Sequence, residues 1–299
     1  MWPSPIRKGS PVICITLGDP RGIGPEVIKK AIFDPAVKNK AYFLIVGEPD
    51  VKKNDADYCA KSALRAINTA FTLILNKKAD AMVTAPVNKE AINKAGIKIE
   101  GHTEYLAGLC GCRRFAMMFV SRPLKVSLVT RHIPLSRVSA SISIKSVCDT
   151  AELTHELMKK RFNLKNPRIG IAGLNPHCGE GGIFGKEERL VIRPAVKKLK
   201  KIFKGISGPV PGDVLLHDAY RGKFDAAVCM YHDQALCAFK MIARDKGVNL
   251  TLGLPFIRTS PDHGTGFDIA GKGIADAGSM VEAIRLAIRL TKRAYNYAN

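Results

Sequence analysis

The stretch Val12-Ile-Cys-Ile-Thr-Leu-Gly-Asp-Pro-Arg-Gly-Ile-Gly-Pro-Glu26 decides the fold class of this chain. It begins with an aliphatic run of strand length, passes through a glycine-rich turn, and reaches Pro25 at the start of a helical pattern. Proline suits the first turn of a helix, because its missing N–H would have no partner there. Strand, glycine turn and helix in this order are typical of an α/β protein with parallel strands.

The same alternation continues along the chain. Runs of strand length are Val12–Leu17, Tyr42–Val46, Ala81–Thr84, Lys125–Thr130, Arg168–Gly173, Ala226–Met230 and Asn249–Leu252. Helical patterns are Pro25–Ile32, Lys61–Leu75, Val87–Ala95, Ser146–Arg161, Glu187–Ile202 and Met280–Tyr295. We therefore predict an α/β fold with a largely parallel sheet. At 299 residues, 46% of them hydrophobic, the chain is long enough for two domains.

The chain is strongly basic, with a formal net charge of +21. Such a charge favours nucleic acid, an anionic membrane or a phosphorylated ligand as partner. Much of the excess lies in lysines typical of an exposed helix face: Lys197, Lys198, Lys200, Lys201 and Lys204. No RNA-recognition, zinc-finger or leucine-zipper pattern accompanies the charge. A nucleic-acid-binding protein is the rival class, and we expect no nucleic-acid partner.

Cysteine usage and hydropathy indicate the compartment. None of the eight cysteines forms a C-x-x-C pair, and several lie in apolar runs, as Cys14 and Cys229 do. Buried or free thiols in a reducing cytosol fit this pattern. No apolar stretch reaches the ~18 residues of a membrane span, and the N-terminus does not resemble a secretory signal. We expect a cytoplasmic protein without a membrane partner.

The glycine turn Gly18–Glu26 has two interpretations. Glycines allow close backbone approach, and a helix N-terminus favours anions, so the turn could bind a phosphate. A tight turn without a ligand explains it equally well. Its spacing is not G-x-G-x-x-G, and no G-K-[ST] follows, so the classical Rossmann fingerprint is absent.

Three histidines each follow soon after a predicted strand: His132, His177 and His232. Ligands of α/β folds bind outside the carboxyl ends of strands. Each histidine alone is more simply an ordinary loop residue. Together, with polar neighbours such as Asp233 and Gln234, they favour a shared site for a divalent metal that would polarise a hydroxyl or a nascent carbonyl.

The segment Leu252–Gly273 is dense in Gly, Asp, Ser and Thr. Arg258 could bind a phosphate or carboxylate through two parallel hydrogen bonds. Asp268 could accept hydrogen bonds from a ribose diol. An ordered surface loop with an incidental arginine is the alternative, but loops this long are uncommon unless they are functional.

Several long motifs now resemble one family, that of 4-hydroxythreonine-4-phosphate dehydrogenase. They are Ile15–Glu26, Thr84–Lys89, Gly101–Glu104, Leu174–Gly182, Tyr231–Gln234 and Gly247–Ser260. His263–Lys272 also resembles the adenosine-binding loop of isopropylmalate and isocitrate dehydrogenases. The resemblance implies their two-domain fold with an interdomain cleft, which has no Rossmann fingerprint. It places residues 1–105 and 255–299 in a discontinuous domain with the adenosine-binding loop, and 106–254 in a domain with the metal ligands and the dimer interface.

The resemblance also implies a reaction. The family uses NAD(P) to oxidise the 3-hydroxyl of 4-phosphooxy-L-threonine. The resulting β-keto acid loses carbon dioxide to give 3-amino-2-oxopropyl phosphate for vitamin B6 synthesis. The family is dimeric with its active site at the subunit interface, so the three histidines need not come from one chain.

Roles follow for individual residues by the same resemblance. Metal ligands would be His132, His177 and His232. Substrate would contact His102, Thr103, Lys240, Asn249 and Arg258. The cofactor would contact His263, Gly264 and Asp268. Lys240 would supply positive charge near the reaction, and Asp233 would handle a proton or support His232.

Three choices stay open at this level. The metal could be Zn²⁺, Co²⁺ or Mg²⁺, and the cofactor NAD or NADP. The substrate could instead be 4-phospho-D-threonate, D-erythronate or an aromatic cis-diol, which sister enzymes of this fold oxidise. The chain also departs from the family pattern: it is short after Gly47, and Ala235 replaces the glycine that usually follows His-Asp-Gln.

Overall fold

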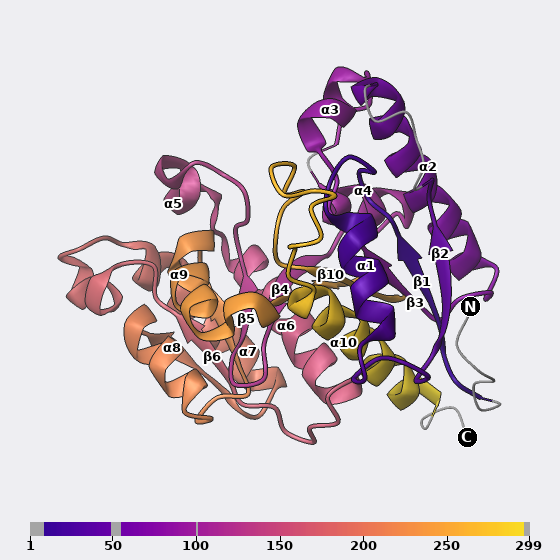
Figure 1. Cartoon of the computed structure of the whole chain (residues 1–299). Coiled ribbons are helices and arrows are strands. Elements are labelled where there is room, and N and C mark those ends of the chain that lie inside the picture. Colours follow the sequence, from indigo (N-terminus) through magenta and orange to yellow (C-terminus); the bar gives the residue numbers. More distant parts are fainter. Residues whose placement is uncertain (1–8, 49–54, 100, 296–299) are drawn as a thin grey trace. The chain divides into compact units, whose positions relative to one another are not determined.

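The computed structural model describes residues 9–48, 55–99 and 101–295. The chain divides into two compact units, which can be followed by sequence colour in Figure 1. The first unit comprises Met1–Arg113, Asp245–Leu250 and Leu254–Asn299, and the second comprises Arg114–Arg244 and Thr251–Gly253. Each unit combines strands with helices, which confirms the predicted α/β class.

The first unit is built on a mostly parallel sheet with the strand order β2-β1-β3-β10-β9. Its strands are β1 (Val12–Thr16), β2 (Tyr42–Val46), β3 (Ala81–Thr84), β10 (Ile257–Pro261) and the first three residues of β9 (Val248–Leu252), whose last two residues belong to the second unit. The β9–β10 pair is antiparallel, and the other neighbours are parallel. Strands β1 and β3 are almost wholly buried, as parallel strands covered on both faces are.

The described residues of the first unit form the helices α1 (Gly24–Phe33), α2 (Ala56–Leu75), α3 (Lys89–Lys94), α4 (His102–Leu109) and α10 (Gly278–Tyr295). Local sequence starts two of them. The side chain of Asp55 accepts from Tyr58 N, and that of Asn88 accepts from Ala91 N. Each satisfies a backbone donor that has no partner within its helix.

The second unit has the strand order β4-β5-β8-β6-β7. Its strands are β4 (Ala116–Val120), β5 (Lys125–Leu128), β6 (Ile169–Ala172), β7 (Ile206–Val210) and β8 (Ala226–Cys229). The β4–β5 pair is an antiparallel hairpin, and the other pairs are parallel. The carboxyl ends of β5, β8 and β6 therefore lie side by side along one edge of the sheet.

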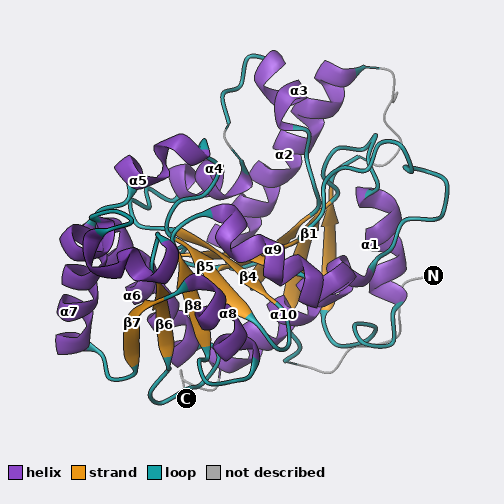
Figure 2. Ribbon diagram, turned by 90° about the vertical axis from the view of Figure 1, so that its left-hand side faces the viewer, coloured by secondary structure: helices purple, strands orange, loops and turns teal. Residues whose placement is uncertain are grey.

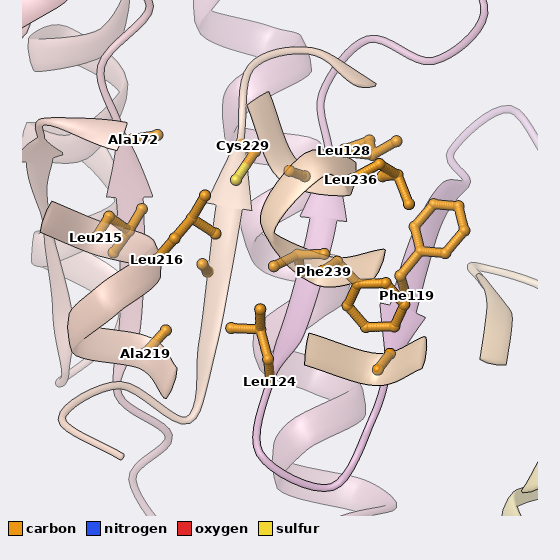
Figure 3. Close-up of a cluster of buried hydrophobic side chains, with 14 of the residues drawn as sticks. Phe119, Leu124, Leu128, Ala172, Leu215, Leu216, Ala219, Cys229, Leu236 and Phe239 are labelled. Atoms are coloured by element: carbon orange, nitrogen blue, oxygen red, sulfur yellow. The ribbon is translucent and has the colours of Figure 1, made fainter. Parts of the chain in front are cut away.

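Helices cover both faces of the strands of the second unit (Figure 2). They are α5 (Val138–Ser141), α6 (Ile144–Lys160), α7 (Arg193–Ile202), α8 (Gly212–Tyr220) and α9 (His232–Ala243). Alternation along β5 separates the two faces. Leu128 packs with Phe239 of α9 in the apolar cluster of Figure 3, whereas Ser127 accepts a hydrogen bond from Thr154 of α6. None of the described helices is long and apolar enough to cross a membrane.

All seven predicted strands are present, and three more were not predicted. Strand β10 corrects the interpretation of residues 252–273 as one long loop, because Arg258 lies within this buried strand. Its sequence, Ile-Arg-Thr-Ser-Pro, is too polar to indicate a strand. Strand β7 contains Gly208 and Pro209, which are tolerated because β7 is an edge strand.

The compact units run close to the predicted domain limits, which stay a prediction. The limit predicted at residue 105 falls inside α4, which its backbone hydrogen bonds keep in one piece. Residues 245–250 join the first unit, since Val248, Asn249 and Leu250 pair with β10. Sequence patterning could not reveal this pairing, because β10 itself is too polar to indicate a strand.

Candidate active site

Arg258 is the most deeply buried charged residue of the predicted site, with 2% of its surface exposed. It lies on β10, beside β3, and its Nε and Nη2 donate to Thr84 Oγ1 at 3.2 and 2.5 Å. Burial lowers the pKa of its guanidinium to about 10, while the charge of Glu104 opposes that shift. A guanidinium favours an anionic ligand, because it can donate two parallel hydrogen bonds to a phosphate or a carboxylate.

His102 begins helix α4 in the same unit, directly before the buried Thr103. Its Nε2 atom is enclosed and has no hydrogen-bond partner among the described residues. Burial lowers the pKa of the imidazole well below its usual value, and the charges of Arg258 and Lys89 lower it further. The ring is therefore neutral at pH 7, with one enclosed nitrogen available to a ligand.

Asn249 supplies a second enclosed polar atom. It lies on β9 opposite Ser260 of β10, and its Oδ1 has no partner in the described part of the chain. Buried polar atoms are normally hydrogen-bonded, so an orphaned one indicates a ligand or ordered water. The first unit thus contains three polar side chains with enclosed polar or charged groups: Asn249, His102 and Arg258.

Lys89 was not assigned a role from the sequence. It is the first residue of α3, and its charge contributes to the lowered pKa of His102. Its position at the end of the Thr84–Lys89 motif could have indicated a role in the site, because Thr84 at the start of this motif accepts hydrogen bonds from Arg258. A further cation here adds to the positive potential around His102.

The predicted cofactor residues lie in the segment between β10 and α10, residues 262–277, which we call the cofactor loop. His263 Nδ1 lies 3.0 Å from the carbonyl oxygen of Gly264, and His263 Nε2 is enclosed without a partner among the described residues. Asp268 is exposed. Buried polar atoms are normally hydrogen-bonded, so the enclosed Nε2 of His263 indicates a ligand or an ordered water at this loop.

Two of the three predicted metal ligands lie together in the second unit. His132 follows β5 and His232 follows the adjacent β8, and their ring centroids are 5.6 Å apart. His232 Nδ1 lies 2.7 Å from Asp233 Oδ1, which fixes the ring and leaves Nε2 for a ligand. This donor pair fits a divalent metal.

His177 follows β6 but does not join the other two. It is exposed and has left-handed backbone angles, as have Cys178 and Glu180 beside it in the turn Pro176–Gly182. Within residues 9–48, 55–99 and 101–295, no three His, Cys, Asp or Glu side chains form a group that could hold a metal. A site with three histidines would need a His177 side chain from a second copy of the chain.

Two further residues shape these histidine-bearing turns: Glu188, which was missed in the sequence, and Gln234, which was noted there only as a polar neighbour of the histidines. Glu188, 2% exposed in the π-helical turn Glu188–Ile192, accepts from the backbone N–H groups of Leu174 and Asn175 at 2.8 and 2.7 Å. Gln234 Oε1 accepts from Met230 N, and its Nε2 donates to Gly173 O at 2.8 Å. Gln234 therefore joins the turn after β8 to the turn after β6.

Both predicted catalytic residues lie on α9. Asp233 is exposed and contacts His232, as described above. Lys240 is exposed about two turns further along the same helix. The backbone of α9 thus fixes their order relative to His232.

The family model of the pyridoxal phosphate biosynthetic protein PdxA matches residues 29–287. The chain belongs to the PdxA family. A curated PdxA relative, the 4-hydroxythreonine-4-phosphate dehydrogenase of Geobacter metallireducens, is 40% identical over 94% of this chain and 96% of its own length. That alignment spans 332 positions, more than the 299 residues of this chain, so the relative has segments without a counterpart here.

Solved structures agree with the PdxA assignment. The 4-hydroxythreonine-4-phosphate dehydrogenase of Klebsiella pneumoniae superposes with a TM-score of 0.83 and 32% identity, covering 94% of this chain and 100% of that one. The terephthalate 1,2-cis-dihydrodiol dehydrogenase of Burkholderia xenovorans is more distant, with a TM-score of 0.66 and 25% identity over 94% and 98% of the two chains. These comparisons confirm the resemblance drawn from the motifs.

Proposed function

We propose that this chain is an NAD(P)-dependent 4-hydroxythreonine-4-phosphate dehydrogenase. It would oxidise the 3-hydroxyl of 4-phosphooxy-L-threonine, and the β-keto acid would lose carbon dioxide to give 3-amino-2-oxopropyl phosphate for pyridoxine 5'-phosphate synthesis. The observation that carries this proposal is the buried cation of Arg258 beside the enclosed His102 Nε2, in a chain of the PdxA family.

The first unit would bind the substrate. Arg258 presents a guanidinium to phosphate or carboxylate, and the neutral ring of His102 accepts or donates one hydrogen bond without adding charge. Asn249 Oδ1 accepts from a substrate amino or hydroxyl group, and Thr103 lines the same helix start. Lys240 is a further proposed substrate contact, carried over from the family resemblance, and it would supply positive charge.

The cofactor loop would hold the nicotinamide nucleotide. His263 Nε2 would meet the heterocycle, Gly264 would allow close approach of the backbone, and Asp268 would accept from the ribose diol. If Asp268 meets the 2'-hydroxyl, its charge disfavours the extra phosphate of NADP, so NAD is the expected cofactor.

His132 and His232 would hold a divalent metal such as Zn²⁺, Co²⁺ or Mg²⁺, with His177 supplied by the partner subunit of a homodimer. When bound, the metal supplies Lewis acidity toward the substrate hydroxyl and the carbonyl it becomes. Asp233 orients His232 through Nδ1 and would accept a proton near the reacting hydroxyl. The protein would act in the cytoplasm without a membrane partner.

The direct test follows NADH formation by the metal-loaded protein with 4-phosphooxy-L-threonine. We expect turnover that disappears in Arg258→Met and in His177→Ala. Turnover with 4-phospho-D-threonate, D-erythronate or an aromatic cis-diol, and none with 4-phosphooxy-L-threonine, would move the chain to a sister activity. Failure with every substrate and both nucleotides would refute the dehydrogenase proposal.

A further inference from the structure

The backbone N–H groups of the glycine turn before α1 donate to other residues of this chain. They are therefore not available to a phosphate, which was one interpretation of this turn. Arg21 N donates to Asp19 Oδ1 at 3.0 Å, and Gly22 N donates to the carbonyl oxygen of Asp19 at 2.9 Å. Ile23 N donates to the carbonyl oxygen of Thr265 at 2.8 Å. These three successive N–H groups are therefore already satisfied, and the third holds the cofactor loop.

Glycine at position 22 is required by this contact. A Cβ atom there would lie 2.7 Å from the carbonyl oxygen of Thr265, closer than real side chains come. Nearby, the guanidinium of Arg21 lies over the ring of Phe267, 5.3 Å from its centroid. The buried Asp19 holds Arg21 in place at 2.8 Å. The turn thus packs against the first half of the cofactor loop.

Helix α1 holds the second half through Glu26 and Lys30, which are one turn apart on the helix. Glu26 Oε1 accepts from Ala275 N at 3.0 Å, and Oε2 accepts from Gly273 N at 3.3 Å. Lys30 Nζ donates to the carbonyl oxygens of Gly273 and Ala275 at 2.8 and 2.7 Å. The two side chains also pair with each other at 3.0 Å.

The Glu26–Lys30 pair therefore forms hydrogen bonds with the backbone of Gly273 and Ala275, as a neighbouring strand would. Both N–H groups and both carbonyl groups of these residues are satisfied by charged partners, which make stronger hydrogen bonds than neutral ones. The loop has no strand or helix of its own that would pair with these two residues.

We infer that Glu26 and Lys30 are positioning residues for the nicotinamide nucleotide, an inference that rests on the proposed role of His263, Gly264 and Asp268. They do not touch the nucleotide. They hold the loop in its binding conformation before the ligand arrives, so that ordering it costs little affinity. The pair belongs to nucleotide binding and not to the chemical step.

The test compares Lys30→Met with Lys29→Met in the full-length protein. Methionine keeps the apolar stem and removes the donors, and Lys29 is an exposed lysine on the same helix. We expect Lys30→Met to raise the Kd for NADH and the KM for NAD by about tenfold, as lost preorganisation and charge-assisted bonds would. The kcat at saturating NAD and the KM for substrate should not change, and Lys30→Arg should restore part of the affinity.

Unchanged NADH affinity in Lys30→Met, with the wild type binding NADH, would overturn this inference and leave the proposed function standing. A wild type that binds neither NADH nor NADPH would overturn the proposed function and the inference with it. Amide hydrogen exchange gives a check that needs no variant. Slow exchange at Gly273 and Ala275 of the free wild type is expected, and rapid exchange there would refute the role of the pair.

Discussion

Arg258 and Thr84 lie on neighbouring parallel strands, and the arginine directs two guanidinium nitrogens at the one threonine hydroxyl. Thr84 in turn is the register partner of Thr16 on β1. Both threonines are fully buried, but Thr16 Oγ1 has no hydrogen-bond partner among the described residues. Of these two hydroxyls at paired positions on adjacent strands, that of Thr84 accepts hydrogen bonds from Arg258, and that of Thr16 has no such contact.

Replacement of Thr84 by valine should destabilise the protein. It removes an acceptor of two hydrogen bonds from a buried guanidinium, at an expected cost of about 1–3 kcal/mol in the free energy of unfolding. Urea denaturation measures this free energy. Thr16→Val is the matched control and should be neutral or stabilising, because it removes an unpartnered buried hydroxyl. Equal losses in both variants would show that the Arg258–Thr84 contact contributes nothing specific.

His102 should make the protein sensitive to acid. Burial lowers its pKa well below 6.5 in the folded state, so the unfolded chain binds the proton more readily. Above pH 6.5 both states are neutral, and stability falls as the pH drops below 6.5 toward the folded-state pKa. In His102→Gln, the free energy of unfolding should fall less steeply over this range in urea titrations. His155, whose pKa burial also lowers, remains in both proteins and cancels from the difference.

His132 and His232 should govern metal affinity. Loss of either imidazole removes a donor from the pair, so His132→Ala and His232→Ala should weaken Co²⁺ binding in calorimetry on the metal-free protein by a hundredfold or more. Asp233→Asn should weaken it by about 10–100-fold, as loss of a supporting partner does. His217→Ala is the control, since this exposed histidine lies on α8. Co²⁺ binding that survives both histidine substitutions would place the metal elsewhere.

Glu188 should set the shape of the turn that carries His177. Glu188→Gln substitutes an amide for a buried carboxylate that accepts from Leu174 N, Asn175 N and Asn175 Nδ2. The Nε2 donor of the glutamine would then face N–H groups that are themselves donors. We therefore expect a loss of about 1–3 kcal/mol in the free energy of unfolding, measured in urea. Glu180→Gln, an exposed carboxylate of the same turn, should lose almost nothing. If the two variants are equally stable, the turn does not depend on the buried carboxylate.

Most of the regular structure was predictable, because it depends on short-range patterning. The aliphatic runs of β1, β3 and β8 are buried strands at the predicted positions, and Pro25 lies in the first turn of α1. Strand β10 escaped prediction because its polar residues are stabilised by partners from elsewhere, such as Thr84 for Arg258. Glu188 escaped for the same reason, since a carboxylate in a helical pattern gives no sign of burial.

Residues close together in the chain encode the α/β class, the strand-end positions of the three histidines and the motifs of the PdxA family, so all of these could be predicted. The order of the strands in the tertiary structure determines which of the three histidines lie close together. Strand order makes β5 and β8 neighbours, so His132 lies beside His232, while His177 follows the next strand and stays apart. The tertiary structure also placed Glu26 and Lys30 against Gly273 and Ala275, more than 240 positions away. Strand order and long-range packing follow from the burial of whole surfaces, which no local pattern encodes.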